Sequence, residues 1–131
     1  MGAGRCAVKP FDYVILRAAP RIQRGEFINV GAVLYCRALD YLGAGWDVNP
    51  ERLKALDPAV DVDVVCASLD QIRAICAGDA AGGPAAGTTI SERFRWLAAP
   101  RSTVVHPSPI HSGITEDPAA DLERLLDSFV R

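Results

Sequence analysis

The chain has 131 residues, 50% of them hydrophobic, and a net charge of −2, values typical of one globular domain and not of a disordered protein. Nucleic-acid binding is disfavoured, because proteins with that role usually carry a basic excess. No apolar run approaches the roughly 18 residues that cross a bilayer, and the N-terminal segment lacks a signal-peptide pattern. We therefore expect no membrane role and a cytoplasmic location.

Two segments rich in β-branched and aromatic residues, 11–19 and 26–36, predict the strands of a β-hairpin. Between them lies the sequence PRIQRG, in which Pro20 and Gly25 suit a turn. A weaker third strand is expected at 44–48.

Capping residues and helical spacing predict two helices in the middle of the chain. Asn49 followed by Pro50 opens a short helix, which ends before Pro58. Apolar residues at helical spacing predict a longer helix over 61–77, which Gly78 stops.

The last third of the chain has mixed signals. The Gly/Ala-rich segment 78–89 is expected to be a flexible surface loop that packs little. A helical turn capped by Ser91 and a short strand at 102–106 follow, and the proline-rich stretch after them is expected to be irregular. Asp117 then caps a terminal helix over 118–130.

This order of elements predicts an α+β fold, with a small, mainly antiparallel sheet of three to five strands covered by two or three helices. We expect the helices at 61–77 and 118–130 to cover at least one face. The chain is expected to form a single domain over 1–131, with residues 1–9 flexible.

Four cysteines, at positions 6, 36, 66 and 76, include no C-x-x-C pair. Because the chain has no export signal, we expect them to be reduced. Cys36, Cys66 and Cys76 are then expected to be small core residues.

The stretch RGEFINVG at 24–31 places polar residues in what should be a strand. If paired hairpin positions sum to about 46, Arg17 lies opposite Asn29, on a face that also carries Gly31, Val33 and Tyr35. This arrangement predicts a polar notch in an apolar face. The alternative is that these residues are solvated hairpin ends and close-packing positions.

The chain resembles an uncharacterised bacterial family of unknown function. Members share the pattern Y-x-x-x-R-x-x-P-x-x-x-R-G-E-x-x-N-V-G and a late F-R-W-L…P-R-S block. The first pattern is matched here by Tyr13, Arg17, Pro20, Arg24, Gly25, Glu26, Asn29, Val30 and Gly31. The resemblance brings no activity. Some members lie beside kinase-like proteins, which implies an accessory role with a protein partner, and the paired blocks imply that both meet at one surface.

The leading hypothesis is a small binding or accessory protein with a polar Arg/Glu/Asn surface for a partner protein or an anionic small molecule, because guanidinium groups suit carboxylates and phosphates. Its candidate binding residues are Arg17, Arg24, Glu26, Asn29, Arg93, Arg95, Arg101 and Ser102. The alternative for the arginines is that they pair with surface acids.

Two competing classes remain. One is an enzyme for a phosphorylated or nucleic-acid substrate, with Glu26 as general base and an arginine clamp. The other is a homodimer with the polar block near its two-fold interface. The histidines, His106 and His111, lack the further ligands of a zinc site, and Ser102 lacks a nucleophile elbow, so we expect no metal, no cofactor and no catalytic residue.

Phe94 and Trp96 are two residues apart. On a strand they would share a face and could stack on a base. On a helical turn they would splay apart, with one of them in the core, and this is the alternative we favour.

Overall fold

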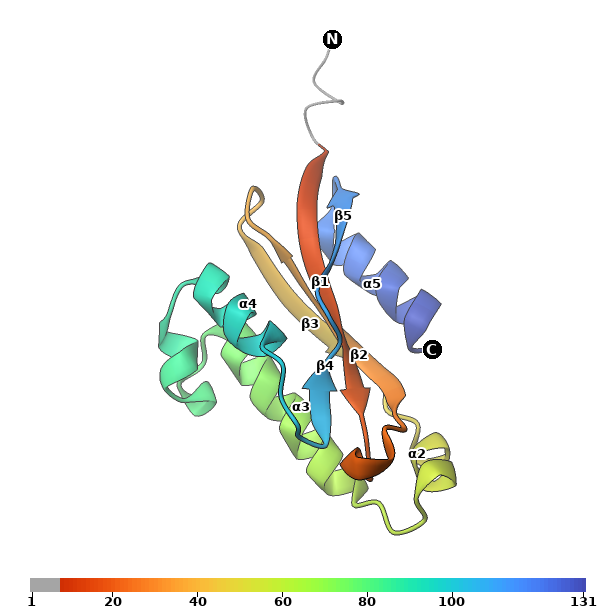
Figure 1. Ribbon diagram of the computed structural model, residues 1–131. Helices are drawn as coiled ribbons and strands as arrows, with labels where there is room; N and C mark the ends of the chain where they lie inside the picture. The colour runs from red at the N-terminus through yellow and green to blue at the C-terminus, as the bar shows by residue number, and fades with distance from the viewer. Residues whose placement is uncertain (1–7) are drawn as a thin grey trace.

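The computed structural model describes residues 8–131 and places a five-stranded antiparallel sheet between helices on both faces (Figure 1). The strands are β1 (Lys9–Ala18), β2 (Ile28–Cys36), β3 (Tyr41–Trp46), β4 (Val105–Pro107) and β5 (His111–Thr115). The helices are α2 (Pro50–Leu56), α3 (Val62–Ala77), α4 (Ile90–Ala98) and α5 (Pro118–Phe129). The fold is therefore α+β, as expected.

The strand order is β3-β2-β1-β4, and β5 also pairs with β1. β4 covers the C-terminal end of β1, and β5 covers its N-terminal half. Ser108 bridges the gap between the two short strands: its backbone N donates to Ile15 O at 2.8 Å, and its Oγ accepts from Ile15 N at 2.9 Å. The predicted irregular stretch is thus partly wrong, because β5 forms there. Prolines and Gly113 hide its alternation in the sequence.

The predicted hairpin is confirmed as β1 and β2. Its turn contains a 3-10 helix at Ile22–Arg24, and Gly25 follows in the left-handed region at φ 68°, where glycine has no steric penalty. The predicted third strand exists as β3, although it begins three residues earlier than expected, at Tyr41.

A β-bulge changes the register of the hairpin. Arg17 pairs with Asn29, as expected, but Leu16 pairs with Gly31, so Val30 is an extra residue between them. Beyond a bulge the two faces of the strand exchange. The prediction that Gly31, Val33 and Tyr35 share a face with Arg17 is therefore wrong.

Gly31 serves strand packing and does not open a notch. A Cβ at this position would lie 2.6 Å from Gly45 O and 2.9 Å from the Trp46 Cβ, so β3 needs a glycine here to approach closely.

The two faces of the sheet carry separate cores. The α3–α4 face has α3 and α4 packed against it, with Val14, Leu16, Val33, Leu69 and Phe94 among its buried residues. The α5 face has α5 packed against it, with Phe11, Ile15, Leu34, Leu122 and Leu126 among its buried residues. Figure 1 shows α5 on one side of β1 and β2 and the pair α3 and α4 on the other.

The helix caps follow the sequence closely. Asn49, Asp61 and Asp117 each accept a backbone N–H in the first turn of their helices, which satisfies amides that have no partner within the helix. The predicted cap Ser91 is wrong, because Thr89 Oγ1 accepts from Glu92 N at 3.2 Å and α4 begins before Ser91.

The cysteines and the Gly/Ala-rich segment differ in part from what the sequence predicts. Cys66 is exposed on α3 and is not a core residue, whereas Cys36 and Cys76 are buried. In the segment 78–89, two 3-10 turns place Gly82 and Ala86 in buried positions, so the expectation that it packs little is wrong there. Its flexibility stays a prediction. Most of residues 1–9 and the first cysteine lie outside the described residues.

Candidate functional site

The candidate residues at the end of the hairpin are solvent-exposed and paired with each other. Arg24 Nε donates to Glu26 Oε1 at 2.7 Å, with about half of each side chain exposed. An exposed ion pair of this kind adds little stability. Glu26 is therefore not enclosed among arginines, the environment that a general base in an arginine clamp requires.

The candidate residues of the late block are dispersed around α4 and the loop after it. Arg95 and Ser102 are exposed. Arg93 Nη1 donates to Cys76 O at 2.9 Å, at the C-terminal end of α3. Arg101 donates from Nε to Ala99 O at 3.3 Å and from Nη2 to Trp96 O, so it satisfies carbonyls at the end of α4.

The two polar blocks meet where β4 pairs with β1. β4 places His106 beside Arg17 on β1, and Arg17 in turn faces Asn29 on β2. Arg93, Arg95 and Arg101 lie on or just after α4, which packs on the other side of the sheet, so they do not converge with Arg17.

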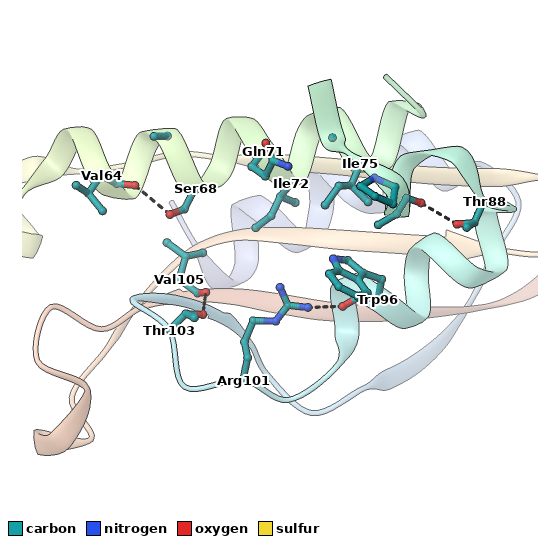
Figure 2. Close-up of a pocket in the computed structure, with 14 residues that line it drawn as sticks. Val64, Ser68, Gln71, Ile72, Ile75, Thr88, Trp96, Arg101, Thr103 and Val105 are labelled. Atoms are coloured by element: carbon teal, nitrogen blue, oxygen red, sulfur yellow. Dashed lines mark hydrogen bonds between the residues drawn. The ribbon is translucent and has the colours of Figure 1, made fainter. Parts of the chain in front are cut away.

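A groove of about 860 Å³ lies beside α3, shown in Figure 2. Its walls come from α3, the two 3-10 turns, the end of α4 and the loop before β4. We call it the α3 groove; its lining residues are Val64, Ala67, Ser68, Gln71, Ile72, Ile75, Gly82, Pro84, Ala85, Thr88, Trp96, Arg101, Thr103 and Val105.

Helical spacing on α3 produces one wall of the groove. Val64, Ser68, Gln71 and Ile75 recur every three or four residues and therefore lie along one side of the helix. Trp96 lies across from them with 55% of its surface exposed. Phe94, two residues earlier in the motif, is buried instead: it is 3% exposed, and its ring stacks on the Tyr35 ring with the centroids 5.3 Å apart. The prediction that these two aromatics splay apart is confirmed.

Most polar groups in the groove are already engaged. The hydroxyls of Ser68, Thr88 and Thr103 donate to backbone carbonyls at 3.0, 2.7 and 2.6 Å. The remaining polar side chains that line it are those of Gln71 and Arg101. Arg101 carries the only charge among the described lining residues, and its Cζ lies 5.9 Å from the Trp96 ring centroid.

The described lining residues of the groove are mainly apolar. No histidine, cysteine or carboxylate is among them, and these are the commonest general acids and bases. The nearby Cys76 is buried beneath it, and burial raises the pKa of this thiol to about 12, against the opposing effect of Arg93. A thiol of that pKa stays protonated and unreactive at neutral pH.

Within residues 8–131, no three histidine, cysteine or acidic side chains are placed to hold a metal ion. None of the helices in this part of the chain combines the length and apolar character needed to cross a membrane.

Sequence reasoning missed the α3 groove because its residues are individually unremarkable. Mostly small and apolar residues from four separate segments create it. Trp96 and Arg101, which lie in the late motif, were the only signal in the sequence.

Comparison with known proteins gives one match. The family model described as a protein of unknown function, DUF3037, matches residues 13–130. No curated protein and no solved structure matches the chain.

Proposed function

Because the chain belongs to DUF3037, a family of unknown function that matches residues 13–130, we propose a function from the geometry of the α3 groove. The protein is a small, non-catalytic accessory protein of the cytoplasm, and the groove holds a segment of a partner protein. That segment is an amphipathic helix with an apolar face and one acidic side chain.

The single observation that carries this proposal is the shape and lining of the groove. It follows α3 from Val64 to Ile75, about 16 Å at the rise of an α-helix. A long apolar groove of this kind suits a helix that presents side chains at i, i+3 or i+4, and i+7. Val64 and Trp96, which both line the groove, are 48% and 55% exposed, and apolar side chains exposed along one surface are typical of interaction surfaces.

Charge supports an acidic residue on the partner. Arg101 is the only charged residue among the described lining residues, and its hydrogen bonds to Trp96 O and Ala99 O use Nη2 and Nε. A guanidinium group has five N–H donors, so donors remain for a carboxylate at the rim of the groove.

The cytoplasmic part of the proposal rests on the cysteines. Cys36, Cys66 and Cys76 are all free thiols in the described part of the chain, which is usual for proteins of a reducing compartment.

The enzyme alternative finds less support. It needs Glu26 in an enclosed pocket, but Glu26 is exposed and paired with Arg24, and it does not line the α3 groove.

Selection from a library of helical peptides tests the proposal. Trp46→Phe leaves Trp96 as the only tryptophan, so its fluorescence reports occupation of the groove. We expect selected peptides to share an apolar face and an Asp or Glu. Ala67→Glu puts a carboxylate into the groove from an exposed position on α3, and it should weaken binding about tenfold, equivalent to about 1.4 kcal/mol.

Ala119→Glu is the matched control, because Ala119 is equally exposed but lies on α5, on the other side of the sheet. It should leave affinity unchanged. Peptides that bind Ala67→Glu and the wild type equally well would show that they bind elsewhere. Selected peptides without any acidic preference would remove the assigned role of Arg101.

A further inference from the structure

A second cluster of polar side chains lies on the α5 face, away from the α3 groove. Asn29, Arg17 and His106 are direct partners across β2, β1 and β4, so their side chains form a row on one face of the sheet. The bulge at Val30 is what places Asn29 in this row. With uninterrupted alternation, Asn29 would share the face of Gly31, which is the opposite one.

Arg17 differs from the other arginines of the hairpin. Arg21 pairs with Asp57 and Arg24 with Glu26, whereas Arg17 has neither an acidic partner nor a hydrogen-bond acceptor among the described residues, and its Nε is buried. A partly buried cation without a counter-ion costs free energy that an anionic ligand would recover.

The Phe27 ring fixes the position of the guanidinium. Arg17 Cζ lies 4.2 Å from the ring centroid, and His106 approaches the same ring edge-on at 6.4 Å. Contact with an aromatic face restrains an arginine without using its N–H donors. Phe27 itself is 42% exposed, so the cluster is open to solvent.

The two flanking residues each retain a donor or acceptor. Asn29 Nδ2 donates one hydrogen to Phe129 O at 3.0 Å, and an amide NH₂ has a second. His106 Nδ1 lies 3.0 Å from Thr103 O. Because a carbonyl only accepts, Nδ1 donates to it. In the neutral ring Nε2 then has no proton, so His106 can donate to a phosphoryl oxygen only in the doubly protonated form, in which both ring nitrogens are donors.

We propose that Arg17, Asn29 and His106 form a binding site for the phosphoryl group of a small molecule. The guanidinium fork can hold two oxygens, and the side chains on either side of it can reach a third. The three side chains approach the ligand from three directions, which suits the oxygens of a tetrahedral phosphoryl group. A planar carboxylate has only two oxygens, and the guanidinium fork of Arg17 can bind both of them without the other two side chains. The site is separate from the α3 groove, since Arg17 and the groove lie on opposite faces of the sheet.

Titration of ¹⁵N-labelled protein with inorganic phosphate, phenyl phosphate and benzoate, at matched ionic strength, tests this site. We expect saturable shifts of backbone amides around positions 17, 29 and 106 with both phosphoryl probes, and weaker binding of benzoate. Arg17→Gln should weaken phosphate binding about tenfold, as expected for loss of hydrogen bonds from a charged group.

Arg24→Gln is the matched control, because it removes the same charge from an exposed arginine that already has a partner. It should change the affinity less than about twofold, the range of long-range effects between screened surface charges. If Arg17→Gln does not fold, Arg17→Lys takes its place, since it keeps the charge and loses the fork.

Three results would overturn the proposal: no saturable shift, equal losses in Arg17→Gln and Arg24→Gln, or benzoate binding as tightly as phenyl phosphate. Ala67→Glu should bind phosphate normally. The outcome at this site is therefore distinguishable from the outcome at the α3 groove.

Discussion

The α3–α4 face and the α5 face of the sheet differ in how completely helices cover them. α3 and α4 pack on the first, where Leu53 of α2 also joins a core of fourteen buried residues, and α5 alone packs on the second, over eight. On the α3–α4 face an apolar groove lies between α3, the 3-10 turns, the end of α4 and the segment that leads into β4. On the α5 face the single helix ends beside Asn29 and leaves a polar row open.

One sheet therefore carries an apolar groove on one face and a row of polar side chains on the other. The central strand β1 supplies both, because its alternate residues point to opposite faces. Leu16 and Ala18 join the core beneath α3, while Arg17 between them joins the polar row.

The largest expected effect is a loss of unfolding free energy when one buried leucine of each core is shortened, which compares the packing of the two cores. Leu69→Ala on the α3–α4 face should cost about 4 kcal/mol of unfolding free energy, and Leu126→Ala on the α5 face about 3 kcal/mol, within the usual range for buried leucines. Leu69 is completely buried and Leu126 is 3% exposed, and the smaller core beside Leu126 can collapse more easily. Urea unfolding measures both values, and the reverse order would show that the α5 face is the better packed one.

A second comparison uses one glycine from each face. A Cβ on Gly31 would meet Gly45 O at 2.6 Å, whereas a Cβ on Gly45 would meet the Leu126 Cδ1 at 2.7 Å. Backbone cannot move without separating β2 from β3, but the end of a leucine can rotate away. Gly31→Ala should therefore cost about 3 kcal/mol and Gly45→Ala about 1 kcal/mol, the range for overpacking. Equal shifts in melting temperature would contradict this reasoning.

The smallest expected effect concerns pH and the α3–α4 face alone. Burial raises the pKa of Cys76 from 9.0 to about 12, so the folded state keeps this proton at a pH where the unfolded state has lost it. The contribution of the Cys76 thiol to the free energy of unfolding is fully present below pH 9 and is lost as pH rises from 9 towards 12. At pH 10 the loss should be about 1.4 kcal/mol, one pKa unit.

Cys76→Ala removes this ionisation. Its unfolding free energy should decrease less than that of the wild type between pH 8 and pH 10, whatever its value at pH 7. Parallel curves for the two proteins in denaturant titrations at each pH would show that the thiol is not the group responsible.

Much of the fold was predictable because local chemistry decides it. Caps at Asn49, Asp61 and Asp117 and β-branched runs in the hairpin specified elements within a few residues. The sequence did not predict β5, because several prolines lie within a few residues of it and because it contains Gly113. That glycine packs over the Phe11 ring, where a Cβ at position 113 would lie 2.7 Å from a ring atom. Only tertiary packing explains that glycine.

The candidate sites were less predictable. Arg17 and Asn29 were identified and do lie opposite each other, but one bulged residue reversed the faces for the rest of β2. His106 was not among the predicted binding residues, because nothing local indicates that β4 pairs with β1. The α3 groove depends on the arrangement of four segments, which no single pattern in the sequence encodes.

The position of β1 has a consequence for synthesis of the chain. β1 is made first, yet its second edge is completed by Ser108 and its neighbours, 93 residues after Ile15. Until those residues leave the ribosome, the central strand of the sheet has a row of unpaired backbone groups, a template for pairing with other chains. A fragment that ends before β4 keeps that edge open permanently. Premature termination anywhere before β4 therefore yields an aggregation-prone product rather than a smaller version of the same fold.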